Sequence, residues 1–281
     1  MDRTSPKLGP MKCIHLDKDK VNLPEYFIKR NIKLLYLQPK FNGIRALWYH
    51  HDGLYSRGGH RITSVPHIVK ELEKIAPDID LDGELYHNSM PFNRINGAAR
   101  RIEPTPDSFC LEYHVFDTIS EYATQTSRLR DIIAIPKSHV IKPLERVVII
   151  LQEIDWFLED YLSRGYEGII LRHTTAPYRE GRHVGNIWAI KPVYEIEAIF
   201  LGFLDGETDL HSNTFGSMLL KLSNGRNFSC SGFTENAREA LWNSPPKRGT
   251  EITIKFGAWS HEDPEKRVPL YPRFKAVRWD K

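Results

Sequence analysis

The spacing of apolar residues changes close to Pro192, and this change indicates a chain built from two domains. Upstream of Pro192, short apolar runs typical of strands alternate with stretches in which apolar residues recur at helical spacing. Downstream, strand-like runs follow one another directly, and only residues 234–242 interrupt them with a helical pattern. We therefore predict an α+β protein with domains at residues 1–192 and 193–281.

The downstream segment has the pattern of a small β-barrel. Its strand-like stretches are residues 195–206, 215–233 and 249–259. An Asn224-Gly225 turn joins two strands within the second of these stretches. Several strands and one helix in a segment of this size suit the partly open oligonucleotide-binding (OB) fold, which we expect for this domain.

The upstream domain is expected to mix strands with helices. Residues 45–59 form a predicted hairpin around an Asp-Gly turn, and residues 65–78 form a predicted helix with Ser64 as its N-cap. The stretch 147–168 is predicted to form a long amphipathic helix that stops at Gly165. Further strands are expected at residues 78–87, 112–119 and 168–173.

The composition is that of a globular protein. The 281 residues are 41% hydrophobic and 27% charged, which allows a substantial core. No apolar run reaches the roughly eighteen residues of a membrane span, and the N-terminus lacks the apolar region of a secretory signal. The three scattered cysteines, Cys13, Cys110 and Cys230, fit neither a disulfide framework nor a zinc site. We expect an intracellular monomer that does not bind membranes.

Charge is nearly balanced overall but not along the chain. Lys and Arg number 39 and Asp and Glu number 36, so the net charge is +3. Residues 266–281, however, hold six basic side chains and one aspartate. Such a basic end is either solvated surface or a set of phosphate contacts.

Lys40 lies between an apolar run and an Asn-Gly pair, with Arg45 five residues further on. The simplest interpretation of such a lysine is a charged edge at a turn. Other charged residues, however, end or begin predicted strands of the same domain. They are Asp82, Glu84, Asp117, Glu167 and Lys191. Each has a structural explanation when taken alone, but their co-occurrence favours one shared site.

Together these residue types suit nucleotidyl transfer. An unprotonated ε-amine is a nucleophile, and Arg45 can hold a ribose or a phosphate. Two separated carboxylates, Glu84 and Glu167, can bind hydrated Mg²⁺ or ribose hydroxyls. The Phe116 ring can stack on a base, and Lys191 can neutralise an α-phosphate as charge develops. The set therefore predicts transfer through a lysine–nucleotide phosphoramide.

A series of short motifs carries a family resemblance. In chain order they are KFNGIR (40–45), SRGG (56–59), LDGEL (81–85), YHVFD (113–117), EGIILR (167–172), WAIKP (188–192) and RFKAVRWDK (273–281). This series resembles the covalent nucleotidyltransferases and, among them, the ATP-dependent DNA ligases. The stretch GSMLLKL…SGFTENAR also resembles the ligase barrel, so the resemblance covers about Leu37 to Lys281.

The resemblance implies an adenylation (nucleotidyltransferase) domain followed by an OB domain, with ATP as substrate and Mg²⁺ or Mn²⁺ as metal ion. Lys40 is then the nucleophile that carries AMP. Gln38 lies at the adenine edge and Phe116 stacks on the adenine. Arg45 and Glu84 hold the ribose.

Further roles follow from the same resemblance. Glu84 and Glu167 act with the metal ion, and Lys191 contacts the α-phosphate. Arg278 and Asp280 orient the departing pyrophosphate. The residues implied to contact nicked double-stranded DNA are Arg57, Arg273 and Lys275.

The implied reaction seals a nick in three steps. The lysine attacks the α-phosphorus of ATP and expels pyrophosphate, and the AMP then passes to the 5′-phosphate of the nick. The 3′-hydroxyl attacks that phosphate and AMP leaves. Each step is an in-line displacement at phosphorus, so catalysis consists mostly of positioning and charge neutralisation.

Two positions depart from the family pattern. Asn42 stands where the first motif usually has Asp, which keeps hydrogen bonding but removes a charge near Lys40. Ala189 stands where the family usually has the first Lys of K-x-K, and only Lys191 remains. A lysine at position 189 is expected to strengthen a phosphate step, unless another basic residue fills that role or the space is closed.

The alternatives are other nucleotidyltransferases and one non-enzyme. An mRNA-capping guanylyltransferase shares the lysine motif and the barrel, but EGIILR and SGFTENAR favour a ligase. An RNA ligase fits the barrel less well, and an NAD-dependent ligase would need a four-cysteine zinc site. A non-catalytic nucleic-acid-binding module would not need the charged residues around Lys40. We expect a minimal DNA ligase of the phage or viral type.

Overall fold

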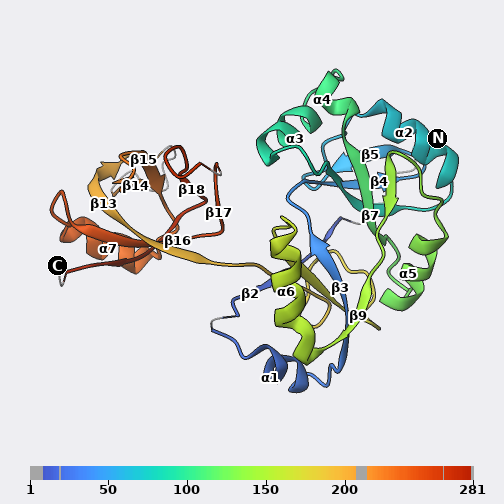
Figure 1. Cartoon of the computed structure of the whole chain (residues 1–281), viewed down its shortest axis with the longest axis horizontal. Helices are drawn as coiled ribbons and strands as arrows, with labels where there is room; N and C mark the ends of the chain where they lie inside the picture. Colours follow the sequence, from blue (N-terminus) through green and yellow to red (C-terminus); the bar gives the residue numbers. More distant parts are fainter. Residues whose placement is uncertain (1–8, 19, 207–213, 262, 280–281) are drawn as a thin grey trace. The chain divides into compact units, whose positions relative to one another are not determined.

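The computed structural model describes residues 9–18, 20–206, 214–261 and 263–279 (Figure 1). The chain divides into two compact units, Met1–Lys191 and Pro192–Lys281. Both units are built mainly on β-sheets, and most of the helices belong to the first. No described helix is both long enough and apolar enough to cross a membrane.

The first unit contains a five-stranded sheet, here called the lysine sheet because it ends in Lys40. Its strands, in spatial order, are β2 (Ile14–Leu16), β12 (Ile187–Ile190), β10 (Gly168–His173), β3 (Leu34–Lys40) and β9 (Val147–Ile150). Alternate residues point to opposite faces of a strand. Leu35 and Leu37 therefore enter a core with α1 (Leu23–Ile28) and α6 (Ile154–Ser163), while Gln38 and Lys40 face the other way.

A second five-stranded sheet completes the first unit. Its spatial order is β5 (Gly53–Ser56), β4 (Ile44–Tyr49), β6 (Leu81–Tyr86), β7 (Glu112–Thr118) and β8 (Ile141–Pro143). Its core includes residues of α2 (Pro66–Ile75), α3 (Phe92–Ala99) and α5 (Gln125–Ala134). The short helix α4 (Pro106–Phe109) follows α3. Because β3 ends at Lys40 and β4 begins at Ile44, the KFNGIR motif is the link between the two sheets.

A two-stranded parallel layer accompanies the lysine sheet. It pairs β1 (Met11–Lys12) with β11 (Gly181–Arg182), in the register Met11 to Gly181 and Lys12 to Arg182. Met11 is buried in a small apolar cluster with Ile170, Tyr178, Ile187 and Ala189. This layer therefore brings the N-terminal strand against the chain between β10 and β12.

The second unit is an antiparallel sheet with one helix. Its strands, in spatial order, are β15 (Asn227–Cys230), β14 (Ser217–Lys221), β13 (Tyr194–Leu204), β16 (Glu251–Phe256) and β19 (Arg273–Val277). The helix α7 (Glu235–Asn243) lies between β15 and β16 in sequence, and β17 (Ala258–Trp259) pairs with β18 (Pro269–Leu270). A bridge between Ser231 and Arg273 joins the ends of the two outermost strands. The Phe274 N–H donates to the Ser231 carbonyl across that bridge, at 2.9 Å.

The structure confirms both predicted hairpins, β4–β5 and β14–β15, and the predicted helix and strands at α2, β6, β7 and β10. The predicted helix over residues 147–168 is wrong at its start. Val147–Ile150 form the edge strand β9, and α6 begins only at Ile154. Four consecutive β-branched residues favour a strand, and pairing with β3 supplies the backbone partners.

The predicted N-cap of α2 is also wrong. Val65 occupies the cap position and makes no side-chain cap bond. The buried Ser64 hydroxyl instead donates to the Ala99 carbonyl at 3.0 Å, tying the start of α2 to the end of α3. A buried hydroxyl needs a partner, and the tertiary contact satisfies it here.

Candidate active site

A cleft of about 920 Å³ opens in the first unit. Both sheets line it, together with α3 and the hairpin that follows β5. Of the residues singled out from the sequence, this cleft is lined by Gln38, Lys40, Arg45, Arg57, Glu84, Phe116 and Glu167. The fold therefore gathers these sequence-distant residues around one cavity.

Lys40, Glu167 and Lys191 meet at one end of this set. The Lys40 Nζ donates to Glu167 Oε2, and the Lys191 Nζ donates to Glu167 Oε1 at 2.8 Å. The Glu167 N–H also donates to the Lys40 carbonyl at 3.0 Å. Burial alone would raise the pKa of Glu167, but the two lysines outweigh it and lower that pKa. The carboxylate therefore holds two amines side by side at the edge of the cleft.

Gly168 makes this meeting possible. Its φ of +155° lies in a region that favours glycine, and a Cβ there would come within 2.2 Å of the Ile190 carbonyl oxygen. Only glycine lets β10 begin this close to the end of β12, which is where Glu167 and Lys191 must approach each other.

Asp82 holds the Arg45 guanidinium in place. The Arg45 Nε donates to Asp82 Oδ1 at 2.6 Å, and its Nη2 donates to Asp82 Oδ2. The Tyr178 hydroxyl also donates to Asp82 Oδ2 at 2.6 Å and accepts the Met11 N–H at 3.2 Å. Asp82 is fully buried, so its charge is satisfied entirely by these donors. Arg45 is thereby held rigidly at the cleft.

Glu84 lies directly across β4–β6 from Arg45. Burial raises the pKa of Glu84 to about 7, although Lys40, Arg45 and the Gly43 N–H all act to lower it. The Gly43 N–H donates to Glu84 Oε1 at 3.2 Å. A Cβ on Gly43 would come within 2.4 Å of the Leu85 carbonyl oxygen, so glycine is needed for this approach. The Glu84 carboxyl in the cleft lining therefore changes its protonation state near neutral pH.

Phe116 lines the cleft, and two guanidinium groups lie near its ring. The Arg45 and Arg172 Cζ atoms lie 5.0 and 5.3 Å from the ring centroid. Arg172 is itself held by the buried Gln38, whose Oε1 accepts the Arg172 Nε–H at 2.9 Å. Arg172 thus contacts both the Phe116 ring and the Gln38 side-chain amide.

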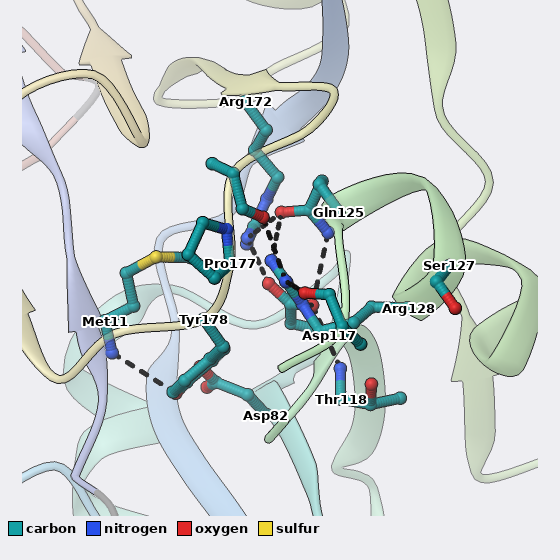
Figure 2. A network of polar contacts seen from close by, with 12 residues as sticks. Met11, Asp82, Asp117, Thr118, Gln125, Ser127, Arg128, Arg172, Pro177 and Tyr178 are labelled. Atoms are coloured by element: carbon teal, nitrogen blue, oxygen red, sulfur yellow. Dashed lines mark hydrogen bonds and ion pairs between the residues drawn. The ribbon is translucent and has the colours of Figure 1, made fainter. Parts of the chain in front are cut away.

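Asp117, which follows Phe116 on β7, is the centre of a buried network (Figure 2). Asp117 accepts hydrogen bonds from Arg128 Nε at 2.8 Å, Arg172 Nη1 at 2.5 Å and Gln125 Nε2 at 3.2 Å. Burial acts to raise the pKa of Asp117, but Arg172 and Arg128 outweigh it and hold that pKa at about 2. The network ties β7, β10 and α5 together below the cleft.

We call the paired groups under the cleft the floor network: Arg45, Asp82, Asp117, Gln125, Arg128, Arg172 and Tyr178. The sequence indicates no role for Asp82 or Asp117 beyond membership of a charged cluster, and no motif in it marks Gln125, Arg128 or Tyr178. Arg128 lies 11 residues from Asp117 and Tyr178 lies 96 residues from Asp82 along the chain, and neither separation is a helix or strand spacing that would mark the pair.

The walls of the cleft carry a different set of charges, here called the wall cations. They are Lys12, Arg57, Arg61, Arg100, Arg101 and Arg182. All are exposed, and none forms an ion pair with a carboxylate of the described residues. Only Glu84 and Glu167 oppose them among the acidic side chains of the lining. The open part of the cleft therefore favours a polyanion.

Three of the residues predicted in the second unit, Arg273, Lys275 and Arg278, lie on or directly after β19. Lys275 pairs with Glu195 at 2.5 Å, and the Arg278 Nη1 lies 3.8 Å from Glu197 Oε1. Arg273 is exposed on β19. Asp280 lies outside the described residues.

Comparison with known proteins is consistent with this geometry. A family model described as an ATP dependent DNA ligase domain matches residues 18–191. A DNA ligase of African swine fever virus (isolate Pig/Kenya/KEN-50/1950) is 27% identical over 270 residues, covering 84% of this chain and 62% of the relative. A DNA ligase of Archaeoglobus fulgidus is 26% identical over 200 residues, covering 63% of this chain and 36% of that protein. The chain thus spans less than two thirds of these relatives.

Solved structures share the fold. A structure from a study of Lig E DNA ligases is 23% identical, has a TM-score of 0.78, and matches 96% of this chain and 99% of its own. The ATP-dependent DNA ligase of bacteriophage T7 in complex with ATP is 16% identical, with a TM-score of 0.54, and matches 96% of this chain and 98% of its own. At such identities the likeness concerns the fold alone.

Proposed function

The chain belongs to the ATP-dependent DNA ligase family, and from that premise we propose that it seals nicks in duplex DNA by way of AMP bound covalently to Lys40. The observation that carries the proposal is the Lys40–Glu167–Lys191 cluster at the cleft. An amine held between a carboxylate and a second cation, beside an aromatic ring and a fixed arginine, suits attack on a nucleoside triphosphate.

The cleft offers a partner for each part of ATP. The Phe116 ring can stack on the adenine, with Gln38 at its edge. Arg45 and Glu84, neighbours across two strands, reach the ribose. Lys191 neutralises charge on the α-phosphate as Lys40 attacks.

The first step forms a bond between Lys40 Nζ and the α-phosphorus and breaks the bond to pyrophosphate. The amine must first give up a proton, and Glu167 keeps it aimed at the phosphorus. In the second step AMP moves to the 5′-phosphate of the nick, which frees Lys40. In the third, the 3′-hydroxyl attacks the same phosphate and AMP departs.

Two carboxylates fit a divalent ion of the Mg²⁺ or Mn²⁺ type. The described residues contain no group of three or more His, Cys, Asp or Glu side chains that could hold a metal ion alone. Mg²⁺ usually takes one or two carboxylates and completes its shell with phosphates and water, which Glu84 and Glu167 allow. When bound, the ion would supply positive charge at the phosphates.

We further assign the two domains to residues 1–192 and 193–281 and propose an OB fold for the second. Its five strands close through the Ser231–Arg273 bridge, and its helix lies between the third and fourth strands of the barrel in sequence. Both features suit a partly open five-stranded barrel. Such a domain can carry Arg278 and Asp280 to ATP, and Arg273 and Lys275 to DNA.

Nicked double-stranded DNA is the proposed partner. Four of the wall cations, Arg57, Arg61, Arg100 and Arg101, can neutralise backbone phosphates without reading sequence, and Arg57 lies at the tip of the hairpin that follows β5. A monomer working inside the cell, of viral or phage type, stays a prediction.

The direct test is label transfer. The purified chain is incubated with ATP or GTP labelled at the α-phosphate and with Mg²⁺, and is then run on a denaturing gel. We expect label from ATP only, its loss in Lys40→Ala, and its retention in Lys33→Ala, which changes an exposed lysine just before β3. Label from GTP instead would favour the guanylyltransferase alternative, and an unlabelled wild type would refute the proposal.

A further inference from the structure

Ala189 occupies a closed position in the structure. It is fully buried in the apolar cluster with Met11, Tyr178 and their neighbours. Met11 and Tyr178 are tied together there by the Met11 N–H bond to the Tyr178 hydroxyl, and Tyr178 in turn binds Asp82. The volume that a lysine side chain at position 189 would need is therefore filled by the β1–β11 layer and by Tyr178.

The same layer brings two cations to the cleft. Successive residues of a strand point to opposite faces, so Met11 enters the apolar cluster while Lys12 points away from it. Lys12 lies opposite Arg182 in the register of β1 and β11, and both side chains line the cleft. Neither has an ion-pair partner among the described carboxylates. The segment that excludes a lysine at 189 thus carries two free positive charges.

His15 places this pair near the reacting lysines. It lies opposite Ala189 in the register of β2 and β12, and it lines the cleft. Burial lowers the pKa of His15, and the positive charges of Lys191, Lys40 and Arg182 lower it further. His15 follows Lys12 by three residues and lies opposite Ala189, two residues before Lys191, so Lys12 and Arg182 come to the side of the cleft where Lys40 and Lys191 hold Glu167.

We propose that Lys12 and Arg182 form the subsite for the β- and γ-phosphates of ATP, replacing the cation that this chain lacks at position 189. The proposal rests on the proposed function, since it concerns the triphosphate of the same reaction. It assigns a positioning role in the first step: the two cations hold the pyrophosphate that leaves when Lys40 attacks.

Phosphate of the triphosphate suits this pair better than phosphate of the DNA. Four other wall cations, Arg57, Arg61, Arg100 and Arg101, come from β5–α2 and from the end of α3, in the second sheet's half of the unit. Lys12 and Arg182 come from the layer that covers the lysine sheet, where Lys191 and Lys40 lie. Contact with the 5′-phosphate of the nick is the competing outcome, and the reaction steps separate the two.

The test measures each step in the full-length chain. Single-turnover adenylation is followed over a series of ATP concentrations, and sealing is followed separately on nicks that already carry AMP. Arg182→Ala should raise the ATP concentration for half-maximal adenylation about tenfold, and Lys12→Ala with Arg182→Ala should raise it further. Sealing of pre-adenylated nicks should stay within about twofold of wild type. Arg182→Lys should restore most of the ATP dependence.

A matched control and a second readout exclude a purely structural effect. Arg130→Ala removes an exposed arginine of α5 that does not line the cleft, and it should leave both steps unchanged. In the reverse reaction, release of AMP from the enzyme should need about tenfold more pyrophosphate in Arg182→Ala than in wild type. A structural defect would not shift the pyrophosphate requirement alone.

The outcomes distinguish this inference from the proposed function. A wild type that takes no label from ATP would refute the function itself. A labelled wild type whose ATP dependence is unchanged in the double variant would overturn the subsite. An equal loss in adenylation and in sealing of pre-adenylated nicks would assign Lys12 and Arg182 to the DNA phosphate instead.

Discussion

The floor network and the wall cations use charge in opposite ways. In the floor network, Asp82 and Asp117 are fully buried, and every oxygen of the two carboxylates accepts a hydrogen bond. The wall cations are exposed and lack acidic partners among the described residues. Both regions are rich in arginine, yet they differ in what the arginines can still bind.

This difference indicates that the buried pairs fix the shape of the cleft, while the exposed cations are available to bind a ligand. A buried charge costs several kcal/mol of desolvation, so it persists only when a partner offsets that cost. Once paired, Arg128 or Arg172 has little attraction left for phosphate but fixes the geometry above it. An exposed cation costs little to maintain and stays available for a polyanion. The floor should therefore control stability, and the walls should control binding.

The largest expected effect comes from breaking the floor. Asp117→Asn would leave Arg128 and Arg172 buried without their counter-charge and should lower the free energy of unfolding by about 3–5 kcal/mol. Urea unfolding measures this loss. Asp131→Asn changes an exposed aspartate of α5 and should stay within about 0.5 kcal/mol of wild type. A loss of similar size in both variants would show that the network does not carry the stability assigned to it.

Glu84 lines the cleft and lies opposite Arg45 of the floor network, and its titration should appear as a pH dependence of the free energy of unfolding. Burial raises the pKa of Glu84 from 4.5 to about 7, so the folded chain holds a proton that the unfolded chain releases. Stability contributed by this group is present below about pH 4.5 and is lost as the pH rises towards 7, by up to about 3 kcal/mol.

Glu84→Gln removes this titration. Unfolding free energies measured between pH 5 and pH 8 should fall with pH more steeply in wild type than in Glu84→Gln. Parallel profiles for the two proteins would mean that Glu84 titrates near its ordinary pKa.

Substitution of wall cations should weaken DNA binding and leave the free energy of unfolding unchanged. Changing both Arg100 and Arg101 to alanine should weaken binding of nicked duplex by about tenfold and reduce the slope of log affinity against log salt by one to two, on the order of one per lost phosphate contact. The free energy of unfolding should stay within about 0.5 kcal/mol of wild type.

A matched control lies on α3, the helix that ends just before Arg100. Arg94 is exposed on α3 but is paired with Asp107 at 2.5 Å and does not line the cleft. Arg94→Ala should change duplex affinity by less than about twofold, because a surface ion pair contributes little. An equal effect of Arg94 and of the Arg100–Arg101 pair would remove the distinction between paired and unpaired cations.

The meeting of Lys40, Glu167 and Lys191 was predictable because each ends or begins a strand within a motif of known order. The floor network was only half predictable. Its carboxylates stand in the motifs LDGEL and YHVFD, but Arg128 and Tyr178 come from an unremarkable helix and loop. Tertiary contacts bring such partners to a buried charge that must be neutralised. Tertiary contacts of this kind leave no periodic signal in the sequence.

The edge strand β9 shows a second limit. Val147–Ile150 continue into an amphipathic helical pattern, and the apolar period alone does not mark where the strand stops. The four β-branched residues were the local signal, and the free edge of β3 decided the outcome. The wall position of Lys12 was likewise invisible, since it depends on the parallel pairing of β1 with β11.

The most direct measurement is the site of AMP attachment. After reaction of the wild type with ATP and Mg²⁺ in the absence of DNA, the protein is digested and the modified peptide is identified by mass spectrometry. We expect one AMP on Lys40, joined to its amine, and its disappearance when a nicked duplex is added. AMP found on Lys191 or on another residue, or none on a chain that nevertheless seals nicks, would contradict it.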